Sequence, residues 1–186
     1  MRVHGIAAAP EGQVNVDLGE YFTCCGDNPD SSQHQWRTYG WDGNRFAQTG
    51  GPTAFGPNPN VTDLAVTASN LVMVKQVDGR WHGTLKMTVV NRGDYEASVR
   101  LYLALPIQLT PSGTGWSGCD VAGDGFSQCK LGVLTVGASR TVQLGFVATH
   151  DPTGHGFVSA HSETESGSYP DRNFGDNRLG ILITAS

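Results

Sequence analysis

The chain has 186 residues, of which 38% are hydrophobic and 16% charged, and both fractions lie below those of an average soluble protein. Its 12 basic and 17 acidic residues give a formal net charge of −5, with no basic run beside aromatic residues. This balance excludes the electrostatic footprint of a nucleic-acid-binding protein. The apolar stretches are shorter than the roughly 18 residues needed to span a bilayer, and the N-terminus lacks the pattern of a signal peptide. We therefore expect no nucleic-acid partner and no membrane insertion.

Residues 1–49 are predicted to form a short β segment. Residues 14–18, V-N-V-D-L, alternate between apolar and polar types, and Q-W-R-T-Y-G-W at 35–41 is typical of a second strand. Asp42-Gly43 then supplies a hairpin turn into a third strand at 44–46. Three short strands bury little surface, so this segment is expected to be stapled by Cys24 or Cys25, docked on another unit, or part of a larger domain.

Residues 50–60, G-G-P-T-A-F-G-P-N-P-N, combine Gly with Pro and predict an extended linker. From residue 61 to 186 the apolar residues come in short alternating runs, each closed by turn-forming residues, and no run keeps a helical period. Strands are predicted at 63–68, 71–77, 83–91, 95–105, 126–134, 138–149, 156–163 and 179–184. Because no crossover helix separates them, the fold class is predicted to be all-β: an antiparallel Ig-like β-sandwich preceded by the short N-terminal β segment.

Alternation also predicts which side chains of this sandwich point inward. The inward set on three of the strands is Leu85, Met87, Val89, Val99, Leu101, Leu103, Leu105, Val142, Leu144 and Phe146. Arg100 and Tyr102 are expected to point outward.

Cys119 and Cys129 enclose a Gly- and Asp-rich loop of a length that a hairpin disulfide closes without strain. A disulfide there implies an oxidising compartment, and two buried free thiols are the alternative. A zinc site would need further ligands at short spacing, which a lone C-x9-C lacks. Neighbouring cysteines such as Cys24 and Cys25 usually seek partners elsewhere, and their pairing stays open.

The order of motifs in residues 61–186 resembles a known group. D-L-A-V near Asp63, V-N-R-G at 90–93, L-P at 105–106, the cysteine loop, V-G-A-S-R-T-V at 136–142 and D-R-N-F-G-D-N at 171–177 follow one another as in Ig-like repeat domains of bacterial surface proteins, including the cell-adhesion-related (CARDB) type. Residues 14–57, with C-C, Q-W-R-T-Y-G-W-D-G-N-R-F and Q-T-G-G-P-T-A-F, are similar to the end of an uncharacterised module of secreted actinobacterial proteins. The resemblance implies an extracellular or cell-surface location within a longer polypeptide, and it supplies no catalytic residues.

Candidate chemical sites are sparse. His150, His155 and His161 do not show the i, i+2 spacing by which strand residues share a metal. Residues 171–177 are oxygen-rich, but the EF-hand template fails in them, and a turn capped by Asn and Asp is the better interpretation. We therefore expect no metal and no cofactor.

Catalytic candidates are equally few. Glu163 and Glu165 lie two apart, and no nucleophile elbow is present. The chain is accordingly predicted not to be an enzyme, although a hydrolase accessory or catalytic fragment remains an unfavoured alternative.

Aromatic residues in polar, turn-flanked positions are the best functional candidates. Trp36, Tyr39 and Trp41 suit a ligand-binding surface, because exposed rings stack on sugars while neighbouring amides and carboxylates bond the hydroxyl groups. Core filling or packing between units is the structural alternative.

The expected function is that of a non-catalytic structural or adhesive module of a bacterial secreted or cell-surface protein. A carbohydrate- or cell-wall-binding module is the alternative, and the expected partner is an unidentified protein or a cell-wall glycan.

Overall fold

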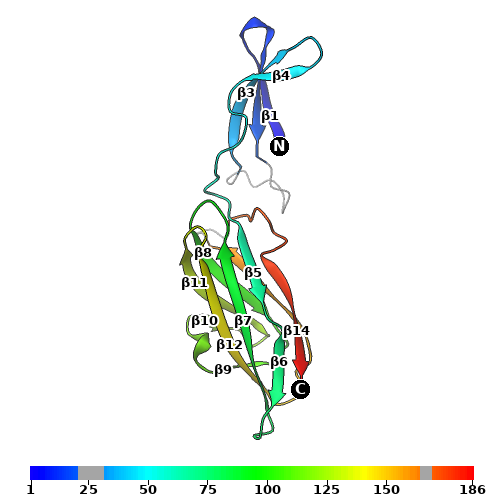
Figure 1. Cartoon of the computed structure of the whole chain (residues 1–186), viewed down its shortest axis with the longest axis vertical. Helices are drawn as coiled ribbons and strands as arrows, with labels where there is room; N and C mark the ends of the chain where they lie inside the picture. The colour runs from blue at the N-terminus through cyan, green and yellow to red at the C-terminus, as the bar shows by residue number, and fades with distance from the viewer. Residues whose placement is uncertain (21–31, 164–168) are drawn as a thin grey trace. The chain divides into compact units, whose positions relative to one another are not determined.

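The computed structural model describes residues 1–20, 32–163 and 169–186, and it is almost entirely β. The chain divides into two compact units, Met1–Val61 and Thr62–Ser186 (Figure 1). Two single-turn 3-10 helices, η1 (Pro10–Gly12) and η2 (Thr114–Trp116), are the helical elements of the described part. None of the helices in those ranges is long and apolar enough to cross a membrane. Cys24, Cys25 and Glu165, considered above, lie outside the described residues.

The first unit is a four-stranded antiparallel sheet in the order β1-β2-β3-β4. Its strands are β1 (Arg2–Ala8), β2 (Val14–Gly19), β3 (His34–Trp41) and β4 (Phe46–Gly50). The turn between β3 and β4 forms because the Asp42 side chain accepts hydrogen bonds from the backbone N–H groups of Asn44 and Arg45, both at 2.9 Å, while Gly43 takes a φ of 99°. This is the turn predicted at Asp42-Gly43.

Strand β1 was not predicted from the sequence. Its residues R-V-H-G-I-A-A include Gly and Ala, which have low strand propensity, and the register shifts between Val3 and Gly5. Pairing with β2, rather than its own pattern, makes this segment a strand.

The segment predicted to be a linker, residues 50–60, lies against the sheet of the first unit. Phe55 packs beside the Arg37 guanidinium at 5.6 Å, and the Gln33 amide donates to the Pro57 carbonyl at 2.8 Å. These contacts bury Arg37 on β3. A proline-rich segment does not join a strand ladder, so its carbonyl oxygens can accept hydrogen bonds from side chains such as Gln33, and these bonds hold the extended segment in place.

The second unit is an Ig-like β-sandwich whose strands pair antiparallel, apart from β6 with β14. One sheet has the order β10-β11-β8-β13-β14-β6, and β5, β7, β12 and β9 form the other (Figure 1). Its strands are β5 (Leu64–Ala68), β6 (Leu71–Lys75), β7 (Trp81–Asn91), β8 (Ala97–Ala104), β9 (Thr110–Ser112), β10 (Cys119–Val121), β11 (Phe126–Leu134), β12 (Ser139–Ala148), β13 (Gly154–Ser162) and β14 (Arg178–Ala185).

The two sheets are joined at β6, which changes sheet along its length. Strand β5 pairs with the C-terminal half of β7, and after residues 69–70 the chain continues as β6, which pairs in parallel with β14. Val74 and Lys75 at the end of β6 still pair with β7. The first strand of the sandwich, divided into β5 and β6, therefore contributes to both sheets. The predicted strand positions do not reveal this division.

The core confirms the alternation predicted from the sequence. Eight of the ten side chains expected to point inward belong to one buried apolar cluster between the sheets, and the other two, Leu105 and Val142, are partly buried and pack against it. Leu85, Leu101 and Leu144 have no exposed surface at all. Period-two alternation in strands that cover one core is sufficient to produce this arrangement.

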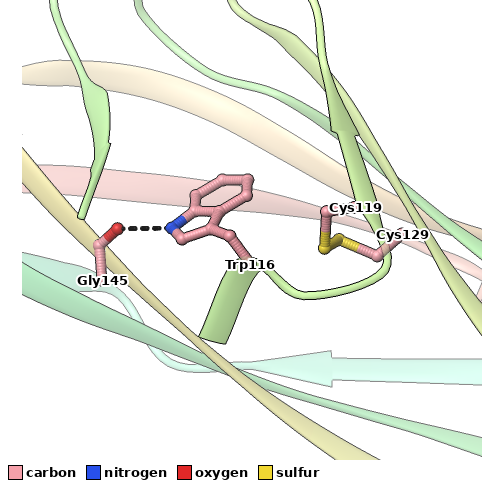
Figure 2. The surroundings of a disulfide bond; sticks show 4 residues. All are labelled: Trp116, Cys119, Cys129 and Gly145. Atoms are coloured by element: carbon pink, nitrogen blue, oxygen red, sulfur yellow. Dashed lines mark hydrogen bonds between the residues drawn. A yellow bond between two sulfur atoms is a disulfide. The ribbon is translucent and has the colours of Figure 1, made fainter. Parts of the chain in front are cut away.

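The predicted disulfide between Cys119 and Cys129 is present and joins two directly paired residues of β10 and β11 (Figure 2). Trp116, in η2 three residues before Cys119, donates its indole N–H to the Gly145 carbonyl at 2.8 Å and meets Phe146 edge-on. A Cβ at Gly145 would lie 2.4 Å from the Ser112 carbonyl oxygen. The residue must therefore be Gly for the β9 region to pack directly on β12.

Asn91 closes the turn that V-N-R-G predicts. Its fully buried side chain donates to the carbonyl oxygens of Tyr95 at 2.8 Å and Leu134 at 2.9 Å, and accepts from the Gly93 N–H at 2.9 Å. One side chain thus ties the β7–β8 turn to the end of β11.

Candidate functional site

An aromatic groove lies on the outer face of the larger sheet, on the side away from the core. Alternation along β13 turns Val158 and Ala160 inward and Phe157, Ser159 and His161 outward. Two adjoining depressions of about 510 and 400 Å³ open on this face, and both are lined by Tyr102 and Phe126. These volumes lie in the range of small-molecule binding sites.

The strand register creates the hollow. Ala104 of β8 is the direct partner of Phe126 on β11 and of Phe157 on β13. A methyl group therefore stands between two benzyl groups, and the space above it stays open. Tyr102, two residues back on β8, completes the aromatic wall.

Polar groups occupy one end of the groove. Ser159 Oγ and His161 Nε2 are 3.1 Å apart, and the His161 ring meets Tyr102 edge-on at 5.2 Å. Burial lowers the pKa of His161 below its ordinary value, so the imidazole is neutral near pH 7. A neutral imidazole offers one donor and one acceptor.

Two arginines lie beside the groove, and one of them has an ionic partner. Arg100 forms an ion pair with Glu163 and donates to the Gln128 side-chain oxygen at 2.9 Å. The Arg178 guanidinium lies 4.1 Å above the Phe157 ring. The groove therefore offers mainly apolar surface and hydrogen-bonding groups, with the Arg178 charge stacked on the Phe157 ring.

The second depression lies beyond Tyr102 and Phe126, towards β10. Asp120, Val121 and Gln128 line it. Asp120 pairs with Gln128, which in turn pairs with Tyr102, so the two depressions form one groove running across neighbouring strands.

Hydrolysis at the polar end would require a nucleophile that a neighbouring general base activates. Ser159 and His161 have suitable spacing, but Ser159 is largely buried and the nearby carboxylate of Glu163 is held by Arg100. A hydrolytic site also needs a group that orients the base and donors for a developing oxyanion. The arrangement is suited to holding a ligand more than to cleaving one.

The three aromatic residues proposed from the sequence do not share one surface. Trp36 lies on one face of β3, whereas Tyr39 and Trp41 lie on the opposite face because their positions differ by an odd number. Trp41 packs edge-on against Phe46 at 5.5 Å, and Tyr39 is partly buried.

Trp36 alone lies within a polar surface. It is 52% exposed, its ring lies over Gly5 of β1, and it pairs with Asp17 of β2. On the same face the Thr38 hydroxyl donates to Asn15 Oδ1 at 2.8 Å. This is a smaller and flatter candidate surface than the groove.

The other two tryptophans of the chain are structural. Trp81 and Trp116 are partly buried and pack against the core of the sandwich. Lys75 lies 5.7 Å from the Trp81 ring centre, and the Trp116 N–H is bonded to Gly145 as described above.

Three carboxylates meet where β5 begins and the loop before β14 ends. Asp63, Asp171 and Asp176 each offer an oxygen, and these atoms lie within 4.8 Å of one another. Burial is the main cause that raises the pKa of both Asp63 and Asp171. The sequence pointed to the 171–177 loop but not to Asp63, which is more than 100 residues away.

The bonds of this acidic cluster are those of a capped turn. The two oxygens of Asp171 accept the backbone N–H groups of Leu64 at 2.8 Å and Asn173 at 2.9 Å, and Asp176 bonds Arg92 at 2.7 Å. The bond to Asn173 is the one that the turn interpretation of this loop implies, and the bond to Leu64 in addition fastens the last loop to the first strand.

The sequence contained only part of the signal for the groove. Tyr102 was expected to point outward, and His161 and Glu163 were considered as candidates, but Phe126 and Phe157 appeared as ordinary strand residues. Residues on three strands come together here, and only the pairing register reveals that they do.

Comparison with known proteins finds no matching family model and no matching curated protein. Solved structures match parts of the chain at low similarity. The ASH/PapD-like domain 7 of human CEP192 is 12% identical with a TM-score of 0.34, covering 74% of this chain and 94% of that one. A GH20 exo-β-N-acetylglucosaminidase from Vibrio harveyi is 12% identical with a TM-score of 0.30, covering 67% of this chain and 18% of the enzyme. A β-glucosidase from Listeria innocua is 10% identical with a TM-score of 0.27, covering 89% and 21% respectively.

Proposed function

We propose that this protein is a non-catalytic adhesive module of a bacterial secreted or cell-surface protein, and that its Ig-like sandwich holds a ligand in the aromatic groove. The observation that carries the proposal is the hollow above Ala104 between Phe126 and Phe157, with Tyr102 beside it. Exposed rings of this kind cost solubility in a folded protein unless a partner covers them.

Two further observations support an extracellular role. The Cys119–Cys129 disulfide is typical of proteins that fold in an oxidising compartment. The motif order from Asp63 to Asn177 resembles CARDB-type repeats, which are modules of bacterial surface proteins. Neither the disulfide nor the motif order involves the groove, so both support an extracellular location whatever ligand the groove binds.

The test is retention of the oxidised full chain on purified bacterial cell wall and on immobilised surface protein extract. The double variant Tyr102→Ala/Phe126→Ala should lose at least tenfold in retention. The matched control, Tyr169→Ala/Phe174→Ala, removes the same two exposed ring types from the loop near β14 and should retain fully. Equal retention of both double variants would contradict the proposal.

A second candidate is carbohydrate binding by the Trp36 surface of the first unit. Its support is one half-exposed indole surrounded by Asp17, Asn15 and Thr38, the combination that stacks and bonds a sugar ring. Trp36→Ala should then abolish glycan retention, whereas Trp41→Ala on the opposite face should not. Loss of folding in Trp36→Ala, seen by circular dichroism, would assign the residue to structure instead.

A further inference from the structure

We infer that the aromatic groove binds a neutral, linear oligosaccharide lying across β13, β8 and β11. The inference rests on the proposed function and names the ligand class of the same site. Its starting point is the continuity of the two depressions on either side of Tyr102 and Phe126. A groove open along its length accommodates an extended polymer, whereas a single small molecule is usually enclosed.

Charge indicates that the ligand is neutral. Arg100 is engaged by Glu163 and Gln128, and His161 is uncharged at neutral pH. Arg178 keeps its charge but is stacked on Phe157 at one end, and the Asp120 carboxylate lines the second depression, so an anionic polymer lying across both depressions would meet a like charge. Binding that does not depend on ion pairs is also insensitive to salt.

The polar groups suit hydroxyl ligands. Ser159, neutral His161 and the Gln128 amide each combine donor and acceptor capacity, and a sugar hydroxyl group both donates and accepts. The aromatic walls meet the other need of a pyranose, whose C–H faces pack on rings.

The position of the groove argues against an extended peptide. Peptides that add to sheets bind through the free backbone of an edge strand, whereas β8 and β13 are paired on both sides. The groove presents side chains alone. A peptide would therefore be held without main-chain hydrogen bonds, and a glycan does not require them.

The experiment is isothermal titration of the full oxidised chain with neutral hexasaccharides: cellohexaose, laminarihexaose, maltohexaose, mannohexaose and chitohexaose, with oligogalacturonate as the charged comparison. We expect at least one neutral hexasaccharide to bind in the micromolar to millimolar range. Its affinity should change less than twofold between 50 and 500 mM NaCl, and the trisaccharide of that series should bind more weakly because it fills one depression.

Two different groove variants are used, so that a loss of binding can be distinguished from a loss of folding. Tyr102→Ala/Phe126→Ala removes the walls, and Ala104→Gln fills the hollow without removing any contact of the core. Both should weaken binding at least tenfold, with Tyr169→Ala/Phe174→Ala within twofold of the parent. If these groove variants bind as the parent does, the inference is wrong.

The outcomes separate the ligand class from the function. If cell-wall retention depends on the groove but no neutral glycan binds or competes, the ligand class is overturned and the adhesive function stands. If only oligogalacturonate binds, with affinity that falls steeply in salt, the neutral assignment is likewise overturned. If retention itself is independent of the groove, the proposed function fails together with this inference.

Discussion

Asn91 offers a direct test of what holds the sandwich together. In Asn91→Ala the carbonyl oxygens of Tyr95 and Leu134 and the N–H of Gly93 lose their partner at once. Each unsatisfied buried backbone group costs about 1–3 kcal/mol, and the Tyr95 carbonyl is only partly buried, so the sum is about 4 kcal/mol. This is a large part of the 5–15 kcal/mol that stabilises a typical domain.

The assay is urea unfolding of the full chain in a Trp36→Phe/Trp41→Phe background, so that fluorescence reports only Trp81 and Trp116 of the second unit. Asn70→Ala is the matched control, because its side chain accepts one exposed hydrogen bond, from Leu182, and its loss should cost less than about 1 kcal/mol. If Asn91→Ala lowers the free energy of unfolding by no more than the control does, with an unchanged urea dependence, the reasoning is refuted.

Three further predictions concern the same unit. Replacing Cys119 and Cys129 together by Ala should lower the free energy of unfolding by roughly 3 kcal/mol, the loop-closure value for this span, and urea unfolding with and without reductant checks it; no difference would show that the bridge restrains nothing. Because burial lowers the pKa of His161, the unfolded chain binds more protons than the folded chain at mildly acidic pH. The free energy of unfolding should therefore fall as the pH drops below about 6.5. His161→Gln should remove that part of the slope, measured as urea midpoints at pH 7.5 and 5.0, and an unchanged slope would contradict it. Burial, then the nearby carboxylate of Asp176, raises the pKa of Asp63, so its ionised form opposes folding at neutral pH and this cost disappears as the pH falls through the raised pKa. Asp63→Asn should therefore raise the melting temperature at pH 7 and raise it less at pH 4; a lower melting temperature at pH 7 would refute the repulsion.

The acidic cluster illustrates how far a local sequence pattern reaches. The run D-R-N-F-G-D-N predicts a turn, and Asp171 does bond the Asn173 N–H two residues on. Its second bond, to Leu64, and the presence of Asp63 beside it depend on the loop meeting the first strand of the sandwich. No local pattern contains that meeting.

The three tryptophan and tyrosine positions proposed at the start show the same limit. Alternation correctly separates Trp36 from Trp41 across the sheet. Whether each face is covered depends on what packs there, and residues 50–60 contact this unit through Phe55, at Arg37 of β3, and through Pro57, at Gln33 just before β3.

Local patterns in the sequence predict the all-β class, most strand positions, the inward side chains of the core and the Cys119–Cys129 bridge. These follow from interactions between near neighbours: period-two alternation, turn residues and the reach of a short loop. Three features depend on how the strands pair: β5 and β6 divide one strand between two sheets, β1 is a strand, and Phe126, Tyr102 and Phe157 surround one groove. Register explains why they escape local patterns, because a partner strand determines which distant side chains become neighbours, and a slip of one residue would turn each of them to the other face.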